Sequence, residues 1–183
     1  MILAEIDAAI EKAQDGILKY VKLMDMVDRV DVSEDADFQR QYNAFYRVQR
    51  RPVAWYHHYY SLMQRLKGQN PEFGEVLDEI YKVTGRYEPS FASKLVATID
   101  PAKPVWDVHV LRNTDLTAPS YANKNKLALA KEAYAAMERW YAHFLASPEG
   151  ALFLNEFDQR VANPQRFTPL KKVDFILWQH RTP

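Results

Sequence analysis

Apolar side chains recur every three or four residues along most of this chain, which is the spacing of one face of an α-helix. Residues 2–28 show it most clearly, with an apolar stripe formed by Ile2, Ile6, Ile10, Ala13, Ile17, Val21 and Met24. No segment alternates as a half-buried strand does, because the best candidate, residues 105–111, is interrupted by Asp107 and His109. The pattern therefore predicts an all-α protein.

Capping residues, prolines and glycines divide this pattern into about eight or nine helices. A second helix is expected to begin after Ser33 or Asp35 and to bury Phe38, Tyr42, Phe45 and Tyr46. Later helices are expected at about residues 53–67, 71–83, 89–99, 105–113, 121–147, 148–162 and 169–179. Asn70 is predicted to cap the fourth helix, with Pro71 at its first position. The last helix is expected to be buried on one side through Leu170, Val173, Ile176 and Leu177.

Length and composition favour one compact domain over residues 1–183, because 183 residues that are 48% hydrophobic suffice for a single core. No repeat of 20–50 residues is present. No apolar run reaches the roughly 18–20 residues of a membrane span, and the N-terminus lacks the basic region of a signal peptide. The chain has no cysteine, which excludes disulfides and thiol catalysis and suits a reducing cytoplasm, the expected location.

The net charge is zero, but it is distributed unevenly. Residues 1–37 carry ten acidic and four basic residues, so the remainder carries an excess of six positive charges. A basic body of this kind could contact a polyanion, whereas a neutral pI argues against strong nonspecific binding of nucleic acid. The alternative is a solvated acidic first helix with no role in recognition.

Several kinds of chemistry are excluded by motifs that the sequence lacks. The five histidines form no His-x-x-x-His pair, so they are interpreted as packing or surface residues and no metal site is expected. The glycine-rich phosphate loops of nucleotide-binding folds are absent, as is the Gly-x-Ser-x-Gly nucleophile turn. No cofactor is expected.

The segment from about residue 87 to 116 is the one stretch whose residue order suggests a functional site. Proline and small residues lead into a helix that carries Lys94 in its expected first turn. A proline-rich turn follows, and Asp107 then opens the next helix, where the helix dipole favours a negative charge. Lys94 and Asp107 are 13 residues apart across this junction, so both side chains could face a common cleft.

This segment resembles the helix-hairpin-helix DNA glycosylase superfamily, of the endonuclease III and 8-oxoguanine glycosylase type, as a divergent bacterial branch. The hairpin of that family reads Pro-Gly-hydrophobic-Gly-x-Lys, and here residues 89–94 read Pro-Ser-Phe-Ala-Ser-Lys. The family then continues to Val-Asp-x-His-Val-x-Arg, and residues 106–112 read Trp-Asp-Val-His-Val-Leu-Arg. The resemblance covers about 25 residues and implies the helical glycosylase scaffold, DNA as partner and DNA repair as activity.

The resemblance also implies roles for single residues. Asp107 would stabilise the positive charge that develops on the sugar as the base leaves, and Lys94 would match the Schiff-base nucleophile of members with lyase activity. Ser90 and Ala92 occupy the hairpin glycine positions where backbone amides bind a DNA phosphate. Ser93 adjoins them, and Arg112 would contact a further phosphate.

Structural interpretations of the same residues stay open. Lys94 can be an exposed lysine near a helix N-terminus, Asp107 a capping residue, and Arg112 a solvated side chain. Two functions therefore remain: a glycosylase-like DNA-binding protein that cleaves N-glycosidic bonds, or a catalytically inert helical scaffold that binds a macromolecular partner.

Overall fold

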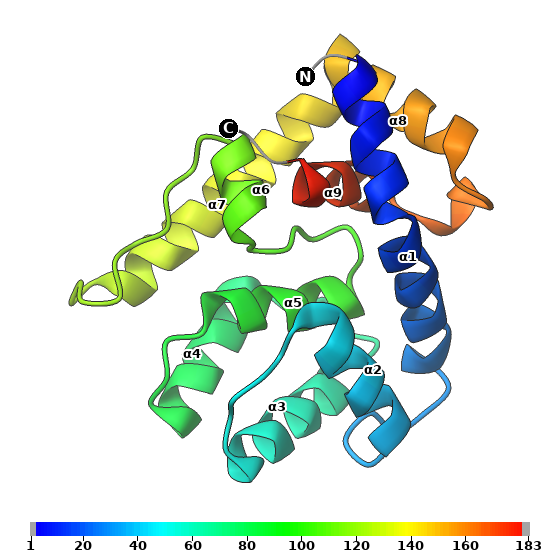
Figure 1. Ribbon diagram of the computed structural model, residues 1–183. Coiled ribbons are helices and arrows are strands. Elements are labelled where there is room, and N and C mark those ends of the chain that lie inside the picture. Colours follow the sequence, from blue (N-terminus) through cyan, green and yellow to red (C-terminus); the bar gives the residue numbers. More distant parts are fainter. Residues whose placement is uncertain (1–2, 181–183) are drawn as a thin grey trace. The chain divides into compact units, whose positions relative to one another are not determined.

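The computed structural model describes residues 3–180, and every regular element in that range is helical (Figure 1). The expected all-α class is confirmed. In chain order the elements are α1 (Leu3–Val27), α2 (Ala36–Tyr46), α3 (Val53–Leu66), α4 (Phe73–Thr84), α5 (Pro89–Ile99), α6 (Val108–Asn113), α7 (Lys126–Leu145), α8 (Pro148–Arg160), the 3₁₀ helix η1 (Pro164–Arg166) and α9 (Pro169–Gln179).

Four helices, α2, α6, α8 and α9, begin at a residue whose side chain caps the helix. Asp35 accepts a hydrogen bond from the backbone N–H of Phe38 at 2.7 Å, which identifies it rather than Ser33 as the cap of α2. Ser147 caps α8 and Thr168 caps α9 through their side-chain oxygens, each followed by proline at the first helical position. These side chains satisfy backbone donors that have no partner inside the helix.

The predicted start of α4 is wrong. The helix begins at Phe73, two residues later than expected, and Glu72 is its N-cap residue without a side-chain hydrogen bond. Its buried residues are Phe73, Val76, Leu77 and Ile80, spaced at three and four residues. The apolar face therefore sets where this helix begins, while the Asn70-Pro71 pair lies in the preceding loop. Its end is as expected, at Gly85 in the left-handed conformation.

The contacts divide the chain into two compact units. The first unit comprises Met1–Asp15 and Pro101–Pro183, and the second comprises Gly16–Asp100. Helix α1 contributes its beginning to the first unit and the rest of its length to the second. The single domain expected from chain length stays a prediction.

The second unit has an aromatic core between α2, α3 and α5. The hydroxyl groups of Tyr42 and Tyr59 lie 2.8 Å apart, and Tyr59 also donates to the backbone carbonyl of Phe91. Trp55 stacks on Tyr59 with ring centroids 4.7 Å apart. The hydroxyls of Tyr42 and Tyr59 are thus paired inside the core, as burial in a region of low polarity favours.

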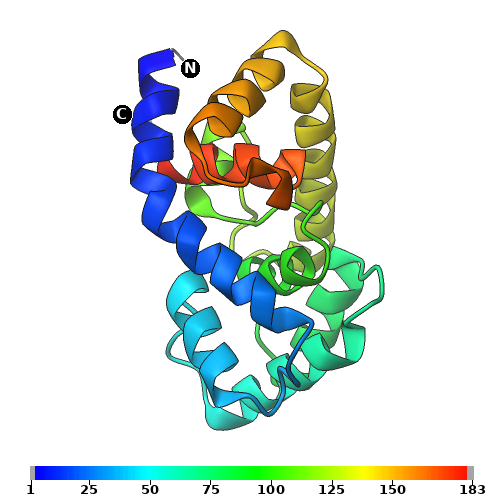
Figure 2. The ribbon, with the colours of Figure 1, turned by 90° about the vertical axis from the view of Figure 1, so that its right-hand side faces the viewer.

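In the first unit, α9 packs against α6, α7 and α8 (Figures 1 and 2). The prediction that it is buried on one side only is wrong, because every residue from Leu170 to Leu177 is buried. That span includes two lysines and an aspartate, for which the sequence suggested a solvated face. Neighbouring helices contact α9 on several sides, so its polar positions have to find partners inside the protein.

The buried charges of α9 are paired. Lys171 Nζ lies 2.9 Å from Asp174 Oδ2, and the hydroxyl of Tyr141 on α7 donates to Asp174 Oδ1 at 3.0 Å. Lys172 Nζ pairs with Asp158 on α8 at 2.5 Å. These contacts satisfy charges that would otherwise be costly to bury.

Candidate functional site

Asp107 is the N-cap residue of α6. Its Oδ1 accepts a hydrogen bond from the backbone N–H of His109 at 2.8 Å, so the capping interpretation is confirmed. The side chain is half-buried, and among the described residues its Oδ2 accepts no hydrogen bond. One carboxylate oxygen is therefore fixed by the helix, while the other has no hydrogen bond within residues 3–180.

The segment around Asp107 is anchored to two other helices of the first unit. Tyr134 on α7 donates its buried hydroxyl to the carbonyl of Pro104 at 2.9 Å. Asn113, at the end of α6, donates its side-chain amide to the carbonyl of Leu177 on α9 at 2.8 Å. Trp106 is 5% exposed, so the residue before the aspartate packs into the unit. These contacts join the segment around Asp107 to α7 and α9.

Tyr141 is a buried polar residue near this segment that the sequence analysis did not single out. Burial raises its pKa well above the usual range, and the negative charges of Asp174 and, more weakly, Asp107 raise it further. The hydroxyl therefore stays protonated and donates to Asp174. The available sequence signal is its position seven residues after Tyr134, which places both tyrosines on one face of α7.

Arg112 lies in the last turn of α6, with its side chain exposed and no ion pair within the described residues. This position suits the solvated interpretation, and it also leaves the guanidinium available to a phosphate. His109 is half-buried beside it on the same short helix.

Lys94 belongs to the second unit and lies in the second turn of α5, not the first turn as expected. Its Nζ donates to the carbonyl of Tyr46 at 3.0 Å and lies 5.1 Å from the ring centroid of Phe91. Tyr46 is the last residue of α2, where the helix dipole favours a positive charge. The lysine is half-buried, so the interpretation as an exposed lysine near a helix N-terminus is wrong.

The neighbouring predicted residues are integrated into α5. Ala92 and Ser93 are 0% exposed, while Ser90 is half-buried in the first turn. The backbone N–H of Ala92 donates to the carbonyl of Glu88 at 2.9 Å, and the Ser93 hydroxyl donates to the carbonyl of Ser90 at 3.0 Å. Neither Ser90 nor Ala92 has a positive φ, so a side chain at either position causes no backbone strain. Their role in DNA binding stays a prediction.

A buried ion pair occupies the N-terminus of α5. Glu88, the N-cap residue, is 7% exposed and accepts from Arg51 Nη2 at 2.9 Å. A second contact joins Arg51 Nε to the other carboxylate oxygen at 2.8 Å. The carboxylate lies at the positive end of the helix, where a bound phosphate would otherwise be favoured.

The predicted site residues fall into two groups. Ser90, Ala92, Ser93 and Lys94 lie together on α5 in the second unit, whereas Asp107 and Arg112 lie at α6 in the first. The common cleft expected for Lys94 and Asp107 stays a prediction.

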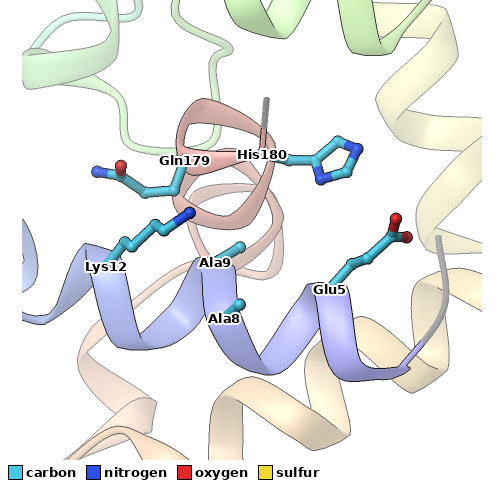
Figure 3. Close-up of a pocket in the computed structure, with 6 residues that line it drawn as sticks. All are labelled: Glu5, Ala8, Ala9, Lys12, Gln179 and His180. Atoms are coloured by element: carbon cyan, nitrogen blue, oxygen red, sulfur yellow. The ribbon is translucent and has the colours of Figure 1, made fainter. Parts of the chain in front are cut away.

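The structure also has a small pocket in the first unit, with a volume of about 190 Å³ (Figure 3). Four of its lining residues, Glu5, Ala8, Ala9 and Lys12, lie on α1, and Gln179 and His180 lie at the end of α9. Figure 3 shows Lys12 on the side of Gln179 and Glu5 on the side of His180, with the alanines between them. None of the predicted site residues lines this pocket.

Across residues 3–180, no group of three or more His, Asp or Glu side chains is placed to hold a metal ion. Over the same range, none of the helices combines the length and the apolar character needed to cross a membrane.

In comparisons with known proteins, no family model, curated protein or solved structure matches this chain.

Proposed function

We propose that this chain is a DNA glycosylase-like protein that cleaves N-glycosidic bonds with Asp107 as its catalytic carboxylate. The observation that carries the proposal is the position of this residue within the Asp-Val-His-Val-Leu-Arg sequence. One of its oxygens caps α6 at 2.8 Å from the His109 amide, and the other accepts no hydrogen bond within the described chain. The resemblance of the segment to the helix-hairpin-helix glycosylases supplies the reaction.

The chemistry requires a negative charge close to a sugar. As the bond between C1′ and the base breaks, positive charge develops on the sugar ring, and a fixed carboxylate stabilises it. The free oxygen of Asp107 would face that charge. The contacts of Tyr134 and Asn113 would keep the carboxylate from moving with the substrate.

Lys94 is proposed as the amine of an accompanying lyase step. Its Nζ would add as the neutral amine to the C1′ aldehyde of the ring-opened, base-free sugar, and the resulting carbinolamine would lose its hydroxyl group as water to form the Schiff base. In the structure the amine donates to the carbonyl of Tyr46, so it would have to leave this contact to react.

Excision by an Asp107→Asn variant tests the proposal. Asparagine caps helices as well as aspartate does, so the free energy of unfolding should change by less than about 0.5 kcal/mol. Excision of damaged bases from duplex DNA should fall by at least about 100-fold, because the charge is lost while the fold is retained.

Asp35→Asn is the matched control, since it removes the same charge from the N-cap of another helix. It should leave excision unchanged. Equal excision rates for the wild-type protein and Asp107→Asn would contradict the mechanism.

A catalytically inert scaffold that binds a macromolecular partner is the second candidate. The observation that favours it is the use of the α5 residues inside the fold: Glu88 occupies the helix N-terminus, and Ala92 and Ser93 are fully buried. This function predicts no excision of any damaged base by the wild-type protein and no effect of Asp107→Asn on binding of the partner.

A further inference from the structure

The loop between α2 and α3 contains three arginines in five residues, Arg47, Arg50 and Arg51, and residues 47–51 are called the arginine loop below. Two of them have left-handed backbone conformations, with φ of 54° at Arg47 and 59° at Arg50. Glycine occupies this conformation without a steric penalty, whereas a residue with a Cβ atom is destabilised there. Glycine at both positions would therefore remove this backbone strain.

No side-chain contact within the described residues explains why arginine occupies these two positions. Both side chains are exposed, and neither forms an ion pair or hydrogen bond with any of the residues described. Their guanidinium groups thus add nothing to the packing that would offset the backbone strain. Arg47 takes the left-handed conformation as the C-cap residue of α2, whereas Arg50 has no such role at a helix end, and strained residues with exposed side chains are typical of functional loops.

The arginine loop itself is held firmly. Arg51 donates to the carbonyl of Arg50 at 3.1 Å and pairs with Glu88, while its guanidinium lies 4.9 Å from the Phe91 ring centroid. Tyr56 on α3 donates its hydroxyl to the carbonyl of Val48 at 3.1 Å. These contacts fix the loop from α3 and α5 of the same unit, so Arg47 and Arg50 extend from an ordered backbone.

The charge that remains on the arginine loop is positive. Glu88 neutralises Arg51, which leaves the charges of Arg47 and Arg50 uncompensated. Their Cα atoms are at most about 10 Å apart, since they are three residues apart along the chain. Long side chains from these positions can therefore reach neighbouring phosphates of one strand, and the planar guanidinium group binds phosphate through two parallel hydrogen bonds.

We infer that the arginine loop binds the phosphodiester backbone of a nucleic acid. This inference rests on the proposed function, for which it supplies the contact that positions the protein on DNA without reading the sequence. A membrane surface is less suitable as the partner, because peripheral membrane binding combines cations with inserted apolar side chains. The one apolar residue of the loop, Val48, is 1% exposed, and a single large apolar side chain, Val53 at the start of α3, is exposed next to the loop in the sequence.

The test measures binding of the full chain to an undamaged, fluorescently labelled duplex by anisotropy at low salt. The Arg47→Gln/Arg50→Gln variant should bind at least about 10-fold more weakly than the wild type. The slope of log affinity against log salt should fall in magnitude by about 1.8, for two lost phosphate contacts. Arg29→Gln/Arg139→Gln is the matched control, since it removes two exposed, unpaired arginines elsewhere, and it should change affinity by less than about 2-fold.

A second variant separates binding from stability. Arg47→Gly/Arg50→Gly relieves the left-handed strain, so it should melt at or above the wild-type temperature and still lose DNA binding. A lower melting temperature would show that the arginine side chains stabilise the loop and would overturn the inference.

Three further results would overturn it: unchanged affinity in the loop variants, an equal loss in the control variant, or binding of wild-type protein to phosphatidylserine vesicles without binding to the duplex. If the loop variants bind undamaged DNA as the wild type does while Asp107-dependent excision persists, the inference fails and the proposed function stands. If the wild-type protein binds no DNA, both fail.

Discussion

At the scale of single residues, the buried tyrosine hydroxyls make the stability of the folded protein depend on pH. Tyr42 and Tyr59 in the second unit and Tyr141 in the first are buried, and burial raises the pKa of each well above its usual value of 10.0. Each hydroxyl donates or accepts a hydrogen bond inside the protein. The folded state therefore contains tyrosines that stay neutral where exposed ones ionise.

This difference in ionisation predicts a loss of stability in alkaline solution. Below pH 10 the buried tyrosines are neutral in both the folded and unfolded states, so their contribution is fully present. Above pH 10 the unfolded chain ionises and the folded protein does not, and each such tyrosine lowers the free energy of unfolding by about 1.4 kcal/mol per pH unit.

The melting temperature should therefore fall steeply above about pH 10, and tyrosinate absorbance should show a group of hydroxyls that ionise only as the helical circular dichroism is lost. Ionisation of all eleven tyrosines near pH 10 with the helical signal intact would contradict the buried, raised-pKa assignment.

The sequence indicates some of the candidate site residues and not the contacts that hold them. The position of Asp107 before an apolar helix predicted its capping role, because that signal is local. The contact of Lys94 with Tyr46 joins residues 48 positions apart, and no local pattern encodes it. The left-handed arginines escaped prediction for a related reason, because arginine is not a residue that marks this conformation.

At the scale of elements, local signals predicted each α-helix but not every boundary. The starts of α4, α6 and α7 at Phe73, Val108 and Lys126 lie later than the expected residues 71, 105 and 121. Local signals also failed where neighbouring helices decide. The boundaries of α5 agree with those expected, since proline at residue 89 and the Asp100-Pro101 pair delimit it. Helix α9 was misjudged because lysine and aspartate indicate solvent exposure in a sequence. Only the packing of α6, α7 and α8 around α9 accounts for their burial.

The junction of α7 and α8 depends on one glycine. A Cβ atom at Gly150 would lie 2.0 Å from the carbonyl oxygen of Phe144, a backbone atom that cannot rotate away. Gly150→Ala should therefore lower the free energy of unfolding by about 2 kcal/mol or more, measured by chemical denaturation.

Gly16→Ala is the matched control, because nothing lies within 4 Å of a Cβ atom at this position of α1. It should raise the free energy of unfolding by about 0.5–1 kcal/mol, since alanine favours the helix. Equal effects of the two substitutions would contradict the close approach at the junction of α7 and α8.

At the scale of the whole molecule, the charge distribution and the all-α class fit both candidate functions, the glycosylase-like protein and the inert scaffold. The acidic excess lies in residues 1–37 and the basic excess in the rest, so the proposed contacts at the arginine loop and at Arg112 both fall in the basic part of the sequence. The all-α class agrees with the proposed glycosylase scaffold and with many others. The proposed activity therefore depends on Asp107 and its surroundings, not on the fold class.

The most direct test of the proposed function is an anisotropy titration at low salt against duplex DNA with a stable abasic-site analogue, compared with the same undamaged duplex. The analogue presents the base-free sugar, so it probes the site without knowledge of the target base. We predict binding at least about 10-fold tighter to the abasic duplex, with this preference reduced by Asp107→Asn and by Lys94→Ala and retained by Asp35→Asn. Equal and weak binding of the wild-type protein to both duplexes would contradict the glycosylase-like function and favour the inert scaffold.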